Sequence, residues 1–131
     1  MRLGFDAAAV ARVEKSLRRA SFAARVYGPR EQALLAQKKN PAATAAANFA
    51  AKEALSKALR CGIFGFDLRE AEVLRRADGS PYFAFAGALA QRLAQSGLAA
   101  EVSLSHEGGM AFACVLLQPT QKERPQSKKD D

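Results

Sequence analysis

The sequence predicts an α+β fold in which antiparallel strands pack against one long central helix, with shorter helices covering the sheet. Three observations indicate this fold. An alanine-rich run over 40–60 is long enough for a helix of about five turns. After it, two pairs of short apolar segments are each separated by glycine-containing turns, at 78–79 and 107–109, which is typical of β-hairpins. A short alternating segment at 2–6 adds one further strand.

The N-terminal half is predicted to contain the strand over 2–6, followed by helices over 7–19, 30–39 and 40–60. The strand ends at an acid, and the first helix has apolar residues at helical spacing on one side and basic residues on the other. A basic stripe is therefore expected to face outward. Asn40 supplies an N-cap side chain to the long helix and Pro41 a fixed φ for its first position, and Gly62 is the expected stop.

The C-terminal half is predicted to contain two hairpins around a brief helix. Their strands are expected over 70–75 and 82–85, and then over 101–105 and 110–117, with the helix over 87–95. The last strand is almost wholly apolar, so the core should run through Val115. We expect residues 1–118 to form one domain and the polar, proline-containing segment 119–131 to be a disordered tail.

The composition is that of an ordinary globular protein. Of the 131 residues, 49% are hydrophobic and 25% are charged, which excludes collagenous and wholly disordered classes. No apolar run approaches the roughly 18 residues that span a bilayer, and the N-terminus lacks a charged region followed by an apolar signal segment. We therefore expect a cytoplasmic protein without a membrane partner. Cys61 and Cys114 have no CxxC spacing, so both are expected to be reduced.

The net charge of +7 predicts a polyanionic partner, because 20 lysines and arginines face 13 aspartates and glutamates. Nucleic acid, a phosphorylated cofactor and an acidic protein would all satisfy it. Charge alone does not choose among these three.

The central helix gathers its polar side chains on one face. At roughly 100° per residue, five of them fall within about 140° of one another: Lys52, Glu53, Ser56, Lys57 and Arg60. Alanines fill much of the remainder and would let a neighbouring backbone come close, whereas Phe49 falls on the polar side as an exception. Spacing alone favours a solvated stripe with a Glu53–Lys57 pair worth a few tenths of a kcal/mol. Asp6, taken alone, would only cap the helix after it.

Five motifs in order along the chain carry a more specific signal. They are GFD at the N-terminus, FAAKEALSKAL in the central helix, CGI after it, DGSPY in the first hairpin and SLSHEGGMAFACV in the second. Together they resemble the holo-acyl-carrier-protein synthase family of 4′-phosphopantetheinyl transferases, over nearly all of the chain up to Leu117. The resemblance implies transfer of 4′-phosphopantetheine from coenzyme A to a serine of apo-acyl carrier protein, with release of 3′,5′-ADP, for fatty acid biosynthesis. It also implies a homotrimer with active sites between subunits.

The resemblance also implies roles for individual residues. Asp6 and Glu53 would bind Mg²⁺, a cation that prefers hard oxygen ligands, one or two carboxylates together with water and substrate phosphate. Lys57 would stabilise the departing 3′,5′-ADP, which with the two acids makes the catalytic set. The residues implied to bind coenzyme A are Lys52, Ser56, Gly62, Ser105 and His106. Arg12 and Arg19 match the positions that bind the acidic carrier protein, where opposite charge steers association.

The roles of His106 and Glu31 are each left open between a functional and a structural interpretation. His106, the single histidine, either contacts a coenzyme A phosphate or acts as a base near the carrier serine, or it merely packs and hydrogen-bonds at a strand end. Glu31 matches a recurrent acid of the family, and a structural role in positioning the first helix stands beside a catalytic one.

The chain departs from the family pattern at two places that bear on coenzyme A. Cys61 stands where the family loop usually has threonine, and Asn48 stands where an arginine often precedes the helix motif, a loss for which Arg60 could compensate. These departures raise the hypothesis of a protein that keeps the fold without the activity. The +7 charge and the arginine-rich first helix raise another, a basic nucleic-acid-binding module that has no use for Glu53. Dependence on a metal ion would separate these cases.

Overall fold

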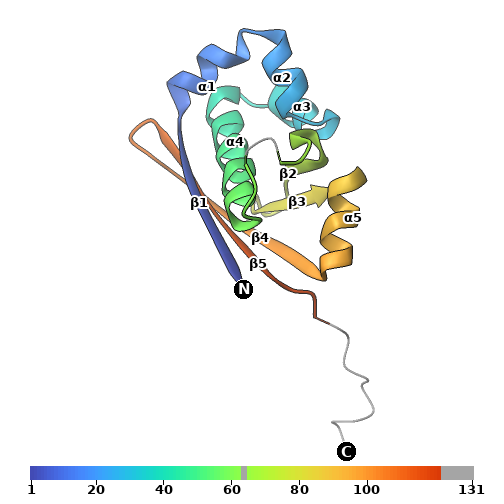
Figure 1. The fold of residues 1–131 in the computed structure, drawn as a ribbon. Helices are drawn as coiled ribbons and strands as arrows, with labels where there is room; N and C mark the ends of the chain where they lie inside the picture. Colours follow the sequence, from blue (N-terminus) through green and yellow to red (C-terminus); the bar gives the residue numbers. More distant parts are fainter. Residues whose placement is uncertain (63–64, 122–131) are drawn as a thin grey trace, which may run out of the picture.

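The computed structural model describes residues 1–62 and 65–121 and confirms the predicted α+β class (Figure 1). The segment 122–131, within the predicted tail, lies outside the described residues. In chain order, the elements are β1 (Arg2–Ala9), α1 (Val10–Leu17), α2 (Ala20–Val26), α3 (Pro29–Ala36), α4 (Pro41–Ala58), the 3₁₀ turn η1 (Leu68–Glu70), β2 (Ala71–Arg75), β3 (Pro81–Phe85), α5 (Gly87–Ser96), β4 (Leu98–Glu107) and β5 (Met110–Pro119).

The long helix α4 lies between two antiparallel sheets (Figure 1). On one side is a three-stranded sheet in the order β1-β5-β4, and on the other is the hairpin β2-β3. Helices α1, α2 and α3 lie around the N-terminal end of α4, and α5 lies beside β3 and β4 (Figure 1). The core forms where α4 meets the larger sheet, and Val115 is fully buried in it, as predicted.

A close approach of two backbones joins β1 to α4. Ala54 and Ala58 are buried on the side of α4 that faces β1, and Gly4 lies against them. A Cβ atom on Gly4 would overlap the carbonyl of Ala54 and lie 2.9 Å from the backbone nitrogen of Ala58, so only glycine fits there. Small residues on both elements therefore bring the end of β1, with Asp6, next to the middle of α4.

The region between β1 and α3 differs from the sequence predictions in where the first helix begins and in having an additional helix. The predicted helix over 7–19 begins instead at Val10, because β1 continues to Ala9, which pairs with Met110 of β5. Ladder hydrogen bonds to β5 outweigh the high helix propensity of the three alanines. The following helix, α2, was not predicted as a separate element.

The end of α4 also differs from the prediction. The helix stops at Ala58 with Leu59 as its C-cap, and the residue in the left-handed region is Arg60, with φ of 60°. Gly62 has no positive φ and is exposed, so the expected glycine stop is wrong by two residues. The N-terminal prediction is confirmed, since the Asn40 side chain accepts a hydrogen bond from the Ala43 backbone at 3.4 Å.

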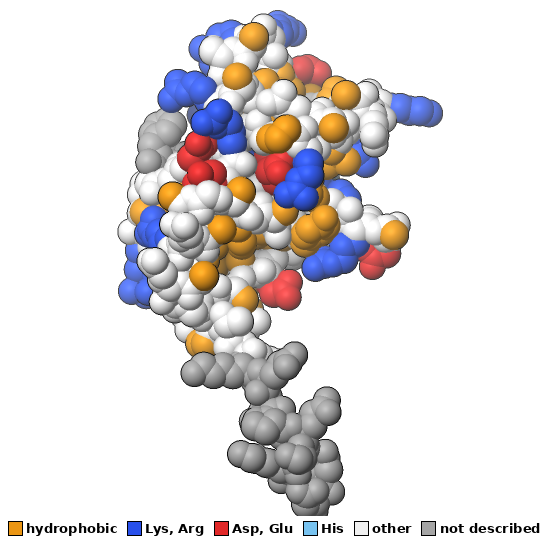
Figure 2. Space-filling view, turned by 90° about the vertical axis from the view of Figure 1, so that its right-hand side faces the viewer, with side chains coloured by type: hydrophobic (Ala, Val, Ile, Leu, Met, Phe, Trp, Pro, Cys, Tyr) orange, Lys and Arg blue, Asp and Glu red, His pale blue; other side chains and the backbone are white. Residues whose placement is uncertain are grey.

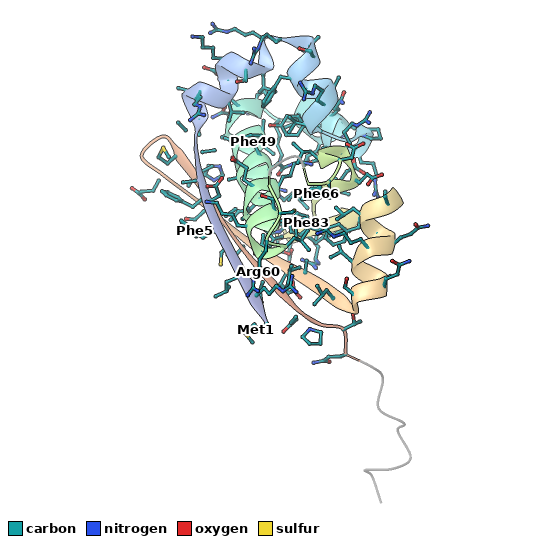
Figure 3. The ribbon with its side chains drawn as sticks, viewed as in Figure 1. Met1, Phe5, Phe49, Arg60, Phe66 and Phe83 are labelled. Carbon is teal, nitrogen blue, oxygen red and sulfur yellow. The ribbon has the colours of Figure 1, made fainter. Side chains whose placement is uncertain are left out.

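The outer face of the larger sheet, turned away from α4, is apolar and open. Leu3 and Phe5 of β1 are 66% and 58% exposed, and Phe5 stacks on Phe112 of β5 with ring centroids 6.2 Å apart. Figure 3 shows Phe5 pointing away from α4. Cys61 and Cys114 are both free, in line with the prediction. Within the described residues, no helix combines the length and hydrophobicity needed to cross a membrane.

Candidate active site

Three predicted catalytic residues meet where β1 passes the middle of α4. The Lys57 ammonium lies 3.0 Å from Asp6 Oδ1 and donates a second hydrogen bond to the Phe5 carbonyl at 3.1 Å. The side chain of Asp6 is 17% exposed, whereas that of Lys57 is 58% exposed. Spacing alone favoured a pair between Lys57 and Glu53 along the helix. In the structure, Lys57 pairs instead with Asp6 of the neighbouring strand.

Glu53 and Asp6 place two carboxyl groups side by side. Burial, followed by the hydrogen bond and the charge of Asp6, raises the pKa of Glu53 to about 7. Lys57 and Arg12 oppose that rise, so Arg12 of α1 also lies close enough to act on this carboxyl group. The site therefore combines a carboxylate pair with two nearby cations.

This donor set fits a divalent cation. Two carboxylates held together repel each other when both are ionised, and a divalent cation between them would relieve that repulsion. In the described ranges no group of three or more His, Cys, Asp and Glu side chains could hold a metal ion. The pair of Asp6 and Glu53 nevertheless matches the preference of Mg²⁺, which often takes one or two carboxylates from the protein while water and substrate phosphates complete its octahedron.

Two residues of the predicted polar face are buried, which corrects the expectation of a solvated stripe. Lys52 is 0% exposed and donates to Glu31 Oε1, Leu68 O and Ala71 O at 2.7, 2.7 and 2.8 Å. All three of its donors are used, which leaves none for the coenzyme A phosphate that the resemblance implied. Ser56 is 4% exposed, and its hydroxyl donates to the Glu53 carbonyl at 2.7 Å.

Gly62 follows α4 and is exposed. Two other residues implied to bind coenzyme A, Ser105 and His106, lie apart from Asp6 within one chain. Ser105 pairs with Phe112 and so lies on the outer face of the sheet, whereas Asp6 pairs with Ala113 on the face toward α4. His106 Nε2 lies 3.0 Å from Ala43 O, near the N-terminus of α4 and about 15 Å along the helix axis from Glu53. A single chain does not bring these residues together.

A groove of about 850 Å³ reaches Glu53 from the side of α2. Phe22, Phe49 and Phe66 line it, and the rings of Phe22 and Phe49 are 5.7 Å apart. Figure 3 labels Phe49 on α4 and Phe66 in the segment that follows the helix, and both line this groove. Basic residues also line the groove: Arg19, Arg25 and Arg69. Arg19, one of the two arginines predicted to bind the carrier protein, thus lies in this groove, and Arg12 lies near Glu53.

Sequence reasoning missed part of this site. The groove has one visible signal in the sequence, Phe49, which breaks the polar face of the helix wheel. The close contact at Gly4 could be suspected from a glycine in the GFD motif facing an alanine-rich helix. The charge of Arg12 beside Glu53, and the burial of Lys52, depend on how the elements pack and have no signal in residue spacing.

A carboxylate pair beside a lysine, at the end of an aromatic and basic groove, is suited to an enzyme that transfers a phosphate-containing group. The sequence pattern of the 4′-phosphopantetheinyl transferase superfamily matches residues 2–115. The chain belongs to this superfamily, as the motifs predicted.

Individual relatives agree with this assignment. The chain is 40% identical over 119 residues to a holo-[acyl-carrier-protein] synthase of Myxococcus xanthus, covering 88% of this chain and 93% of that protein. The solved structure of the synthase from Neisseria meningitidis superposes with a TM-score of 0.83 at 30% identity, covering 89% of this chain and 97% of that one. A synthase from Helicobacter pylori in complex with coenzyme A has a TM-score of 0.76 at 28% identity, covering 88% and 99%.

Proposed function

We propose that this chain transfers the 4′-phosphopantetheine arm of coenzyme A to a serine of apo-acyl carrier protein, with Asp6 and Glu53 holding Mg²⁺. Its superfamily and its holo-[acyl-carrier-protein] synthase relatives support the activity, and a relative whose structure contains coenzyme A supports the donor. The single observation that carries the site is the hydrogen-bonded pair of carboxyl groups, Glu53 and Asp6, beside the Lys57 ammonium.

In this reaction, the carrier serine oxygen forms a bond to the proximal phosphorus of the pyrophosphate, the bond to 3′,5′-ADP breaks, and the serine proton leaves to a base. Mg²⁺ held by the two carboxylates would neutralise charge on the pyrophosphate. The Lys57 ammonium is largely exposed beside Asp6, where its positive charge can stabilise the negative charge that develops on the departing ADP. Arg12 and Arg19 would orient the acidic carrier protein toward the same place.

We also propose that the chain works as a homotrimer with each site between two subunits. One chain leaves Ser105 and His106 away from Asp6, although the resemblance gives all three to one substrate. The open apolar face around Leu3 and Phe5 is a surface that a second copy could cover. This arrangement would complete the coenzyme A site with residues from two chains.

The charge of +7 is explained by this function without nucleic acid. The family and its relatives give no support to the rival hypothesis of a nucleic-acid-binding module. Figure 2 shows lysine and arginine side chains separated by hydrophobic and acidic ones on the face in view, rather than joined in one basic patch. We place the activity in the cytoplasm and in fatty acid biosynthesis.

Intact-mass analysis of an apo-acyl carrier protein incubated with the protein, coenzyme A and Mg²⁺ tests this proposal. We expect the carrier protein to gain the mass of one phosphopantetheine. This gain should be absent with Glu53→Ala. It should also be absent when a chelator is added to the wild-type protein, and should return when Mg²⁺ is restored. Gln91→Ala, at an exposed position of α5 away from the larger sheet's outer face, is the control and should leave the gain unchanged. A wild-type protein that leaves several apo-carrier proteins unmodified would contradict the proposal.

A further inference from the structure

Lys52 precedes the carboxylate residue Glu53 but lies on the buried side of α4. Its ammonium has three acceptors within 2.8 Å: the Glu31 carboxylate and the carbonyls of Leu68 and Ala71. The side chains of Lys52 and Glu31 are both 0% exposed. An ammonium has three donors, so this geometry satisfies it completely.

The Glu31 carboxylate is equally well bound. Its Oε1 also accepts from the Gly28 backbone at 3.0 Å, and its Oε2 accepts from Asn48 Nδ2 at 3.0 Å. Asn48 in turn donates to Val73 O at 2.9 Å and accepts from Arg75 Nη2 at 2.9 Å. In the described part of the chain, every buried side-chain nitrogen and oxygen has a hydrogen-bond partner.

The Lys52 junction joins three parts of the fold: α3 through Glu31, α4 through Lys52 itself, and the η1 turn through Leu68 and Ala71. The two carbonyls lie at the start of η1 and directly after it. Lys52 therefore holds both ends of this short turn against α4.

The η1 turn forms one wall of the groove that reaches Glu53. Its residues Leu68 and Arg69 line the groove, together with Phe66 just before it. Glu53 lies in the same groove, one residue after Lys52. Anchoring Lys52 thus fixes both the rotation of α4 that directs Glu53 and the wall that faces it.

A lysine at this position supplies hydrogen-bond donors to two buried carbonyls, which an apolar residue could not do. A buried ion pair alone contributes little stability compared with well-packed apolar residues of the same volume. Here, however, the same ammonium also satisfies two buried carbonyls, and an unsatisfied buried carbonyl is costly. The lysine is therefore explained by the turn that it holds, without any contact to substrate.

We infer that Lys52 is a positioning residue for the transfer reaction: it holds the η1 wall of the groove and directs Glu53, and it does not touch coenzyme A. This inference rests on the proposed transferase function. Because the groove wall carries basic and aromatic residues suited to an acidic protein, the docking of the carrier protein depends on Lys52, in addition to the chemical step in which Glu53 takes part.

Lysine labelling of the wild-type protein tests the place of Lys52 without any variant. The folded protein is treated with acetic anhydride in the absence and presence of coenzyme A, and each lysine is quantified by peptide mass spectrometry. We expect Lys57 to react and to be protected by coenzyme A, and Lys52 to stay unmodified in both conditions. Modification of Lys52 that coenzyme A suppresses would overturn the inference.

Steady-state kinetics with Glu31→Gln/Lys52→Met, which removes both buried charges together, test the positioning role. Loss of the two carbonyl contacts should raise KM for the carrier protein by about tenfold while KM for coenzyme A changes by less than about twofold. Lys57→Met is the comparison variant and should lower kcat without raising KM for the carrier protein. A rise confined to KM for coenzyme A, or no change in either KM, would overturn the inference.

The two proposals fail separately in these experiments. A wild-type protein without transferase activity contradicts the proposed function, while labelling still decides whether coenzyme A reaches Lys52. If the double variant does not fold, as seen by circular dichroism, the labelling experiment on the wild-type protein gives the decision.

Discussion

Asp6 and Glu53 are a pair in which each carboxyl group changes the behaviour of the other. Glu53 is partly buried, and the nearby Asp6 disfavours its ionised form, so its pKa lies well above that of an ordinary glutamate. In the metal-free protein, Glu53 is therefore protonated over part of the range in which most carboxylates are ionised. Below that pKa, a cation that binds there has to displace a proton.

Metal binding should weaken as the pH falls through the pKa of Glu53. That pKa is raised to about 7, so the proton competes below pH 7 and is absent well above it. We expect the dissociation constant for Mg²⁺, measured by isothermal titration calorimetry, to be about tenfold higher at pH 6 than at pH 8. Equal constants at the two pH values would show that Glu53 does not ligate the metal.

The buried pair of Glu31 and Lys52 should give non-additive stability effects. Lys52→Met alone leaves the Glu31 charge buried without its partner, and should lower the free energy of unfolding by about 3–5 kcal/mol. Adding Glu31→Gln removes that charge, so the double variant should be more stable than Lys52→Met. Urea denaturation followed by circular dichroism measures both. A double variant less stable than Lys52→Met would contradict this expectation.

Single residues show how far the candidate site could be predicted. Asp6, Glu53 and Lys57 were named from motifs, and the structure brings them together because two motifs meet across β1 and α4. Lys52 could not be placed in the same way. A helix wheel gives the direction of a side chain, but whether that direction faces water depends on α3 and η1, which the wheel does not contain.

At the scale of elements, the contact of β1 with α4 decides where the site forms. Gly4 lies against the helix backbone, and the alanines on α4 leave room for it. Two residues further along β1, Asp6 then comes beside Glu53. The small residues thus position the carboxylates although they carry no chemistry themselves.

Gly4→Ala should separate β1 from α4. The added methyl group overlaps the Ala54 carbonyl, so the free energy of unfolding should fall by about 1–3 kcal/mol or more. Metal-dependent activity should fall with it, because Asp6 moves away from Glu53. Thermal unfolding and the mass assay measure the two effects.

Gly62→Ala is the control for stability at this scale. Within the described ranges, and apart from its chain neighbours, no atom lies within 4 Å of a Cβ placed there, and its φ is not positive, so the change should stay within about 0.5 kcal/mol. Equal losses from the two substitutions would show that the contact at Gly4 is not tight.

Elements with strong local signals were predicted well, and those fixed by neighbours were not. Both hairpins and α4 follow from turn residues and from an N-cap, which act within a few positions of the chain. The stretch from Ala7 to Ala9 has the composition of a helix but joins β1, because β5 offers it a ladder. The sequence of either strand alone does not contain that information.

At the scale of the whole molecule, the open face of the larger sheet is the surface that bears on assembly. Phe5→Glu places a charge on this face, where Phe5 of the edge strand β1 stacks on Phe112 of the central strand β5. If copies meet there, analytical ultracentrifugation should show a fall from the trimer mass to the monomer mass, with loss of transfer activity. Gln91→Glu, on an exposed position of α5, is the control and should leave the mass unchanged. A trimer that persists in Phe5→Glu would place the interface elsewhere.

The contact between Gly4 and α4 has a further consequence for how this protein can change. Main-chain atoms of Gly4 lie against main-chain atoms of α4 there, so the separation of the two backbones that carry Asp6 and Glu53 is set by van der Waals radii rather than by an intervening side chain. Substitutions elsewhere in the core can repack without altering that spacing. Related sequences should therefore vary freely in the core around this site but keep the glycine and the alanines that face it. A core redesigned around these small residues should keep the same catalytic geometry.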